Sequence, residues 1–263
     1  MMPVANARMY SVAPGAAAAW RALLEHAIAR AGVAMDVVDH PPPAGLPELW
    51  SRPDLGAVFM CGWPFAQEGG VRPIVAAPIP RAGWSGGRPV YRASFVVAAN
   101  SPHRTVNDVL GRRFAFNARH SHSGWNMPMA HLAAIGAPPF ASFVGPFVTH
   151  QSAIRAVADG AADLAAIDSY VLDLLHRHDP SLASSVRVVA TTPEGPIPML
   201  VGTHPTQGDP LGEAARDRFR RALLELDQTA EGRRLLDALE LLGFADVAAE
   251  DYAVALKVEA DAA

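Results

Sequence analysis

The sequence predicts an α/β protein of two lobes, each built on its own mixed or parallel sheet. Short apolar runs alternate along the chain with segments whose apolar residues recur at helical spacing. Strands separated by helices favour parallel pairing with right-handed crossovers. Two longer apolar runs, residues 91–99 and 186–191, bracket a block that shows this alternation by itself. We therefore expect one lobe from residues 1–94 and 191–263, a second from residues 95–190, two crossover strands joining them, and a ligand cleft between them.

The individual elements follow from the same patterns. Strands are expected over residues 9–12, 33–38, 55–61, 91–99, 113–116, 143–148, 164–167, 186–191 and 199–202. Helices are expected over residues 16–31, 46–50, 105–110, 123–135, 152–158, 170–178, 211–226 and 231–242, with a short one near Tyr252. Gly32, Gly136 and Gly160 stand where a glycine commonly ends a helix. The last helices have no predicted sheet of their own.

Composition excludes several classes of protein. Of 263 residues, 50% are hydrophobic and 18% are charged, which is typical of a globular chain and not of a disordered one. The net charge is −4 and the charges form no blocks, so an electrostatic nucleic-acid surface is not expected. Cys61 is the only cysteine, which excludes an intramolecular disulfide and argues against a cysteine zinc site.

Two further absences concern membranes and export. No apolar run reaches the roughly 18 residues of a membrane span, so no membrane insertion is expected. The first residues lack the basic stretch and apolar run of a secretory signal. As encoded, the sequence therefore predicts a cytoplasmic protein.

The segment from Asn117 to Pro128 is the richest in chemistry. It joins a predicted strand to a predicted helix, and Ser121 or Ser123 can cap that helix while Gly124 lets the backbone approach a ligand. Backbone N–H groups of a first helical turn, with two hydroxyls and the His122 imidazole, suit a tetrahedral oxyanion. Helix capping without any ligand is the alternative.

Two other patterns are weaker. His120, His122 and His150 suggest a metal site, but no acidic residue lies near them in the sequence. Gly83-Trp-Ser-Gly-Gly87 has the spacing of a hydrolase nucleophile motif, which requires a strand before the serine and a helix after it. Here Pro80 precedes the motif and a strand follows it, so a glycine turn is favoured.

Several single residues are candidates for the wall of a ligand cleft. Trp63 follows the strand over residues 55–61 and either stacks on a ligand or belongs to the core. Tyr91 begins a crossover strand and either points its hydroxyl into the cleft or is structural. Asp168 ends a buried strand, where it either binds an amine or hydroxyl or caps the next helix.

Three segments resemble the substrate-binding components of phosphate, phosphite and phosphonate ABC transporters, which are type II periplasmic binding proteins. Residues 105–115 resemble the beginning of the family's second lobe, and Ser121-His-Ser-Gly-Trp-Asn126 resembles its Ser-x-Ser-Gly helix start. Residues 149–168 match a 20-residue family pattern with the same spacing and are the most specific of the three. The nearest branch carries Cys-Gly-Tyr-Pro, with Trp63 here in place of the tyrosine.

The resemblance implies a set of ligand contacts. Ser121, His122 and Ser123 would hold the oxyanion, with His150 at the same end, and Trp63 and Tyr91 would wall the cleft. Asp168 would contact the distal group of the ligand or fix the hinge. Gly124, Asn126 and Tyr10 complete the predicted set, and no cofactor or metal is expected. His122 replaces a threonine of the phosphonate binders, so stronger binding is expected as the pH falls near 6.5.

The predicted function is non-catalytic binding of a small phosphonate- or phosphate-like oxyanion, by a transporter's solute-binding protein or a sensor derived from one. An ABC-transporter permease is the implied partner, and the resemblance implies a periplasmic location. The alternative is an enzyme on the same scaffold, either a synthase of the thiamine pyrimidine precursor or a hydrolase. The single Cys61 argues against the synthase, whose relatives carry a cysteine-rich motif. A transcription regulator's effector domain ranks last, because no helix-turn-helix segment is present.

Overall fold

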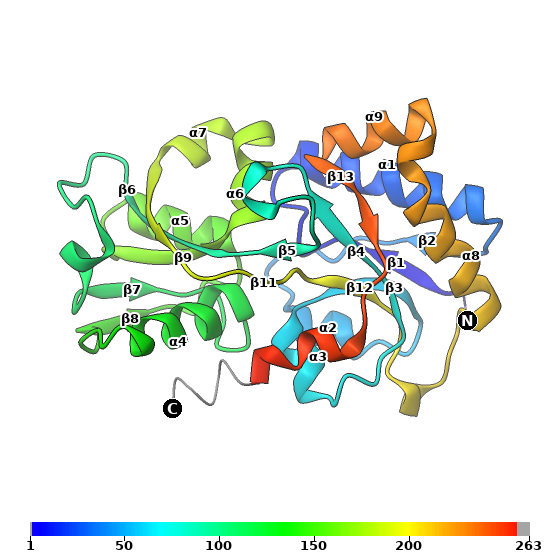
Figure 1. Cartoon of the computed structure of the whole chain (residues 1–263), viewed down its shortest axis with the longest axis horizontal. Helices are drawn as coiled ribbons and strands as arrows, with labels where there is room; N and C mark the ends of the chain where they lie inside the picture. The colour runs from blue at the N-terminus through cyan, green and yellow to red at the C-terminus, as the bar shows by residue number, and fades with distance from the viewer. Residues whose placement is uncertain (1, 257–263) are drawn as a thin grey trace. The chain divides into compact units, whose positions relative to one another are not determined.

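The computed structural model describes residues 2–256, which form two compact units. One unit contains residues 2–90 and 196–252, and the other contains residues 91–195 together with 253–256. Each unit has its own sheet with helices packed on it (Figure 1). The predicted α/β class is therefore confirmed.

The first unit is built on a six-stranded mixed sheet in the order β13-β4-β12-β3-β1-β2. Strand β1 is parallel to β2 and β3, whereas β12 is antiparallel to β3 and β4, and β13 is antiparallel to β4. All six residues of β3 are buried, as expected for a strand covered on both faces. The strands are β1 (Val4–Asn6), β2 (Asp36–Val37), β3 (Leu55–Met60), β4 (Ile74–Pro80), β12 (Met199–Val201) and β13 (Leu241–Ala245).

Helices cover both faces of this sheet. Helix α1 packs with α8 and α9 on one face, while α2 and α3 lie on the other (Figure 1). The Trp20 ring of α1 meets the Phe59 ring edge to face at 5.0 Å, which ties the longest helix to the central strand β3. Gly32 ends α1 in the left-handed conformation, as predicted. The helices are α1 (Pro14–Ala31), α2 (Leu46–Trp50), α3 (Gly62–Gln67), α8 (Glu213–Leu224) and α9 (Ala230–Ala238).

The second unit is built on a five-stranded sheet in the order β10-β6-β9-β7-β8. Strands β9, β7 and β8 are mutually parallel, and β6 is antiparallel to both β9 and β10. A separate two-stranded sheet pairs β5 (Val90–Tyr91) with β11 (Gly195–Pro196). The five strands are β6 (Ala93–Ala98), β7 (Arg113–Ala115), β8 (Ser142–Val144), β9 (Leu164–Asp168) and β10 (Val186–Thr191).

Each of the three parallel strands is followed by a helix that starts at the same edge of the sheet. Strand β7 leads to the π-turn η3 (His122–Asn126) and on to α4 (Met127–Ala134), and β8 leads to α5 (His150–Ala158). Strand β9 passes directly into α6 (Ser169–His178), which α7 (Pro180–Ser184) follows. Because the carboxyl ends of parallel strands share one edge, the first turns of these helices are neighbours.

Two predicted elements are wrong. The strand expected over residues 9–12 is a turn, because the place between β3 and β2 is taken by residues 4–6 and Tyr10 packs into the core instead. The helix expected over residues 231–242 ends at Ala238, and β13 follows it. Glu240 takes a left-handed φ of 54° between the two, a break that no glycine or proline announces. The C-terminal region therefore does contribute a strand to a sheet.

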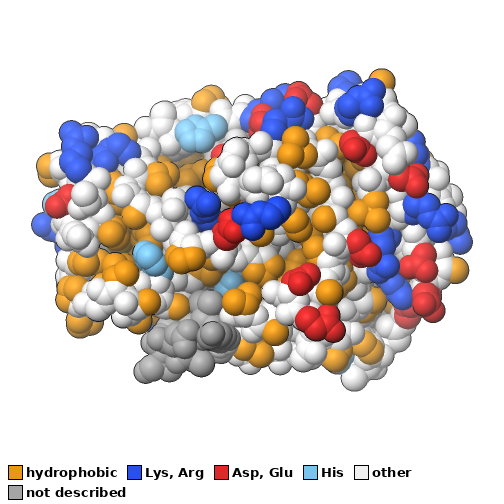
Figure 2. Space-filling model, viewed as in Figure 1, with side chains coloured by type: hydrophobic (Ala, Val, Ile, Leu, Met, Phe, Trp, Pro, Cys, Tyr) orange, Lys and Arg blue, Asp and Glu red, His pale blue; other side chains and the backbone are white. Residues whose placement is uncertain are grey.

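The charged side chains show no segregation by sign on the face seen in Figure 2, where basic and acidic groups are intermixed. Within residues 2–256, no helix combines the length and the hydropathy that crossing a bilayer requires.

Tyr252 anchors the turn η6 (Ala249–Tyr252) to the first unit. Its side chain is fully buried, and its hydroxyl donates a hydrogen bond of 2.9 Å to the carbonyl of Ile197. Its ring also meets the Phe65 ring edge to face at 5.5 Å. The C-terminal turn is therefore held by both packing and a buried polar contact.

We expect Tyr252→Phe to lower the free energy of unfolding by about 1–3 kcal/mol, because the buried carbonyl of Ile197 loses its partner while the ring packing stays. Urea unfolding followed by circular dichroism measures this change. A Tyr252→Phe protein as stable as the parent would show that the hydrogen bond contributes nothing net.

Candidate anion-binding site in the second unit

Ser121 caps the π-turn that leads into α4. Its Oγ accepts hydrogen bonds from the Gly124 backbone N–H at 3.0 Å and from the Asn117 side-chain amide at 3.2 Å. Its carbonyl accepts the N–H groups of Trp125 and Asn126. Ser121 therefore caps the helix start, as the alternative prediction stated. Because its oxygen accepts both of these bonds, the hydroxyl proton can still donate a further hydrogen bond.

Gly124 is required by the packing of this turn. A Cβ at position 124 would overlap the side-chain oxygen of Asn117 and lie 3.0 Å from Ser121 Oγ. That this glycine also lets the backbone approach a ligand stays a prediction. Its absent side chain makes room for the Asn117 amide that fixes Ser121.

His122 lies in the interior of the unit, with a side chain that is 1% exposed. Its ring centroid is 6.3 Å from that of Tyr91, and a Cβ added to Gly195 would lie 3.8 Å from its Nε2. His122 Nδ1 and the buried Oδ1 of Asn126 have no partner at good hydrogen-bond geometry among residues 2–256, although the Asn126 side chain lies close enough to influence His122. Buried polar atoms are seldom left in this state, so these two are candidates for ligand contacts.

Ser123 and His150 lie at the starts of two helices, and their side chains are close together. The Ser123 Oγ lies 3.4 Å from His150 Nε2. His150 is the first residue of α5, and Thr149 caps that helix by accepting the N–H of Ser152 at 3.0 Å. The first turn of η3 and the first turn of α5 therefore meet side by side, and both carry the partial positive charge of a helix N-terminus.

The positive potential of this region comes from dipoles. Burial lowers the pKa of His122 to about 4, an effect that the nearby Asn126 side chain opposes weakly, and burial alone lowers the pKa of His150 to about 4. Both imidazoles are therefore neutral near pH 7. The Arg119 guanidinium lies 3.6 Å above the Trp125 ring centroid, so its charge is held among aromatic rings.

The remaining predicted residues fall into three situations. Tyr91 is fully buried beside His122, and its predicted contact with a ligand stays a prediction. Asp168 caps α6, with Oδ1 accepting the N–H groups of Tyr170 and Val171 at 2.8 and 3.3 Å. In the first unit, Tyr10 is a core residue whose ring meets that of Phe59 at 5.0 Å.

Trp63 is the predicted first-unit residue that keeps an unused polar atom. It lies in α3 and is half-buried, and its indole N–H has no acceptor within the described part of the chain. That Trp63 and the residues around His122 contact the same ligand stays a prediction.

The weaker sequence patterns do not form catalytic or metal sites. Ser85 is fully buried in a short 3₁₀ turn, and its Oγ donates to the Pro80 carbonyl at 2.7 Å, which makes it a structural residue of a glycine turn. The described residues contain no group of three or more histidine, cysteine, aspartate or glutamate side chains placed to hold a metal ion.

Two contributors to the site were not predicted from the sequence. Asn117 lies two residues after strand β7 and its side chain reaches Ser121 at the helix start. It begins the segment that the sequence singled out, but no role was predicted for it. Gly195 lies far along the chain beside His122 and carries no sequence signal for this role.

A family model described as the periplasmic substrate-binding protein of the phosphonate ABC transporter matches residues 58–252. The chain belongs to this family. The resemblance drawn from residues 105–115, 121–126 and 149–168 is thereby confirmed. A search of curated proteins found no matching sequence.

Solved structures confirm the predicted periplasmic-binding-protein fold. A binding protein of a Pseudomonas aeruginosa phosphonate transporter is 17% identical with a TM-score of 0.77, over 98% of this chain and 85% of that chain. PhnD1 of Prochlorococcus marinus in complex with methylphosphonate is 19% identical with a TM-score of 0.77, over 97% and 96%. A Xanthomonas citri protein bound to ATP is 18% identical with a TM-score of 0.65, over 99% and 96%.

Gly124→Ala should lower the free energy of unfolding by roughly 1–3 kcal/mol, because the new methyl group displaces Asn117 from Ser121. Gly83→Ala is the matched control, since a Cβ there meets no atom within 4 Å. Chemical denaturation of both variants measures the difference. Equal stabilities would contradict the packing role of Gly124.

Stability should also depend on pH through His122 and His150. Their folded pKa values lie below the unfolded value near 6.5, so the stabilisation is complete above pH 6.5 and is lost as the pH falls toward 4. We expect a loss of about 1 kcal/mol per histidine between pH 6.5 and 5.5.

Urea midpoints measured over this pH range test the expectation. The double variant His122→Gln/His150→Gln should show a shallower decline than the parent, while the exposed His176→Gln should decline as the parent does. A double variant with the parent's pH slope would show that neither histidine is held neutral by burial.

Proposed function

We propose that this chain binds a small phosphonate of the methylphosphonate type, without chemical turnover, where the first turns of η3 and α5 meet. The main observation that supports this proposal is the distance of 3.4 Å between Ser123 Oγ and His150 Nε2, which places the two helix starts next to each other. The ligand contacts we propose are Ser121, His122, Ser123, Gly124, Asn126, His150 and Tyr91.

The chemistry of these groups suits a tetrahedral oxyanion. Backbone N–H groups of two helix starts, two serine hydroxyls and neutral imidazoles donate hydrogen bonds from several directions. A charge-assisted bond from a neutral donor to an anion is stronger than a neutral pair, so an anion can be held without a buried cation. The family's description and the methylphosphonate complex of the Prochlorococcus relative support the same ligand class.

The site lacks the arrangement that nucleophilic catalysis needs. A serine–histidine pair becomes a nucleophile and base when a third group orients the imidazole. His150 Nδ1 has no such partner anywhere in residues 2–256. This supports binding without turnover and disfavours the enzyme alternative.

His122 becomes protonated at a lower pH than the value near 6.5 that was predicted from the sequence. Its pKa is lowered to about 4 by burial, so a free site gains the extra positive charge well below pH 6.5. A bound anion raises this pKa by favouring the imidazolium. Affinity should therefore be flat near pH 7 and increase as the pH falls toward 5.

Transport is the role that we infer for the bound ligand. Family membership supports delivery to an ABC-transporter permease, with the chain acting as the carrier. The family is described as periplasmic, while the compartment in which this chain works stays a prediction.

Methylphosphonate at a thousand times its dissociation constant should raise the stability by about 4 kcal/mol, which is roughly 8–16 °C in Tm for a chain of this size. Ser123→Ala and His122→Ala should each weaken binding about 10- to 100-fold, because a donor to a charged ligand is lost. Thermal unfolding and isothermal titration measure both effects.

His176→Ala is the matched control, since His176 is exposed on α6 of the same unit. Phosphate, phosphite and sulfate serve as competing oxyanions, and phosphorus NMR of the recovered ligand reports any turnover. A Tm unmoved by every oxyanion, or a ligand that is converted, would overturn the proposal.

A further inference from the structure

Strand β8 leaves one edge of the second unit's sheet open. It is the last strand in the order β10-β6-β9-β7-β8, so no strand among residues 2–256 pairs with its outer side (Figure 1). The Val144 carbonyl faces β7, where it accepts the N–H of Phe116 at 3.1 Å. Successive residues of a strand direct their backbone groups to opposite sides, so the N–H and C=O of Phe143 point outward. An open edge of this kind can take up another strand.

The side chain at the middle of this edge is apolar and accessible. Phe143 is 41% exposed, and its ring is held against those of Trp125 and Phe140, with centroids at 4.8 and 5.7 Å. Edges that are protected against pairing commonly carry a charged side chain instead. Pro139 and Pro146 lack an N–H group and lie on either side of the strand, so the open edge is short. A partner strand of about five residues would cover it.

Two arginines beside this edge have no carboxylate partner among residues 2–256. The exposed guanidinium of Arg119 lies 5.1 Å from the Phe143 ring centroid. Stacking on an aromatic ring leaves the N–H groups in the guanidinium plane free to donate. Arg112 adjoins the start of β8, because its carbonyl accepts the N–H of Ala141 at 3.0 Å. The Arg112 side chain is exposed and donates at 3.1 Å to the carbonyl of Asp108, which carries no charge.

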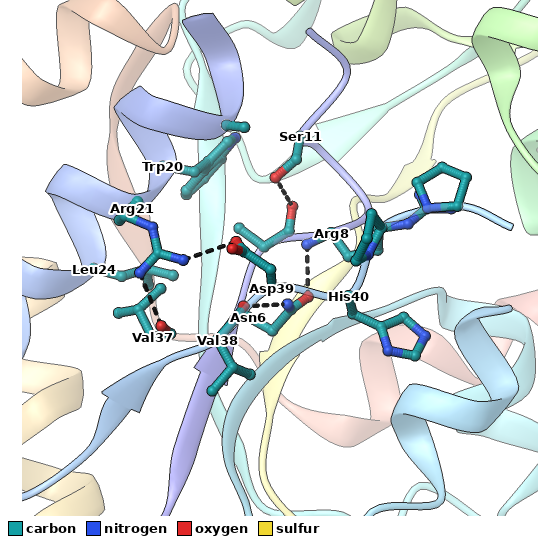
Figure 3. Close-up of a pocket in the computed structure, with 14 residues that line it drawn as sticks. Asn6, Arg8, Ser11, Trp20, Arg21, Leu24, Val37, Val38, Asp39 and His40 are labelled. Carbon is teal, nitrogen blue, oxygen red and sulfur yellow. Dashed lines mark hydrogen bonds and ion pairs between the residues drawn. The ribbon is translucent and has the colours of Figure 1, made fainter. Parts of the chain in front are cut away.

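The segment that forms this edge has no acidic residue of its own. Residues 109–158 include β7, α4, β8 and α5 and contain four arginines but no aspartate or glutamate. Arg113 holds the carboxylate of Asp163, which lies outside this segment, with Nε and Nη2 at 2.9 and 3.0 Å. Ion pairs of this kind also occur in the first unit, where Arg21 donates to Asp39 at 2.7 Å (Figure 3). At the β8 edge the positive charge is left for an external anion to balance.

The charges also decide between two kinds of strand that could pair with β8. Two copies of this chain paired through β8 about a two-fold axis would bring Arg119 and Arg112 of one copy close to those of the other. Like charges that face each other across paired strands are destabilising, so a second copy fits this edge poorly. A strand that carries carboxylates has the complementary charge.

We propose that the outer edge of β8 binds an extended acidic peptide segment of another protein, which adds a strand to the sheet. The backbone of that segment would pair with the outward N–H and C=O of Phe143, and an apolar side chain would pack on the Phe143 ring. A carboxylate would accept hydrogen bonds from Arg119, while Arg112 would attract a second one near the start of β8. None of these residues belongs to the proposed phosphonate contacts, so either proposal can fail without the other.

The probe for this surface is the peptide acetyl-Glu-Val-Thr-Val-Glu-amide, which combines acidic ends with residues that favour strands. It should bind the full chain, and fluorescence anisotropy of a labelled peptide measures its affinity. Replacing both glutamates by glutamine should weaken binding about tenfold, because charge-assisted hydrogen bonds are lost. N-methylation of the three central residues should abolish binding, because it removes the N–H groups that pair with the strand.

Variants of the chain test the two arginines separately. Arg119→Gln should weaken peptide binding about tenfold and Arg112→Gln about threefold, since an exposed charge pair in water contributes less than a stacked donor. Arg155→Gln is the matched control, because Arg155 is an exposed arginine of α5 in the same acid-free segment and should leave the affinity unchanged within about twofold. All three side chains are exposed, so each variant should unfold at the parent's temperature.

Hydrogen exchange distinguishes strand addition from simple ion pairing. Exchange over residues 140–145 should slow at least about tenfold when the peptide is bound. No binding up to about 1 mM peptide, or equal binding of the N-methylated peptide, overturns the proposal. So does a dimer in sedimentation that Phe143→Ser dissociates, which would assign the edge to a second copy. Binding to phosphatidylglycerol vesicles that Arg119→Gln abolishes, without binding of the peptide, would assign the charge to a membrane surface instead.

Discussion

The hydrogen bonds of Ser121 set the geometry on which the candidate site depends. By accepting from Gly124 and from Asn117, its hydroxyl fixes the π-turn at the start of α4. That turn carries His122 and Ser123 on successive residues, so its conformation decides that one side chain lies beside Tyr91 and the other beside His150. A regular α-helical start would rotate these two side chains to different positions. π-turns inside helices are frequent at functional sites, and here the capping serine selects one.

The parallel arrangement of β9, β7 and β8 provides the second constraint. It places the starts of α4, α5 and α6 at one edge of the sheet, but the three starts are used differently. At α6, the carboxylate of Asp168 already occupies the N–H groups, which makes that start a capped, structural one. The first turns of η3 and α5 have neutral caps, Ser121 and Thr149, so their dipoles remain uncompensated by charge. The sequence difference between an acidic and a hydroxyl cap thus separates an anion-repelling helix start from two anion-attracting ones.

The sequence predicted those features that depend on local patterns. The sequence patterns predicted helix α1, its end at Gly32 and strand β9, because apolar periodicity and glycine placement are properties of neighbouring residues. Strand β13 was not predicted, since the left-handed conformation of Glu240, which separates β13 from α9, has no local sequence signal. In the candidate site, Ser121 and His122 were predicted from the sequence, but the packing roles of Gly124 and Gly195 depend on atoms that the fold brings together. Tyr91 and His122 are likewise adjacent only through tertiary packing.

The way in which the proposed site would attract an anion bears on affinity and release. Around His122 the donors are neutral, so the charge of the proposed ligand would be met by dipoles, which cost little to keep buried when no anion is present. A buried cation in the same place would be a full charge that costs free energy until an anion meets it. A carrier that must give up its ligand is better served by dipoles than by a buried ion pair, because breaking such a pair leaves an uncompensated charge.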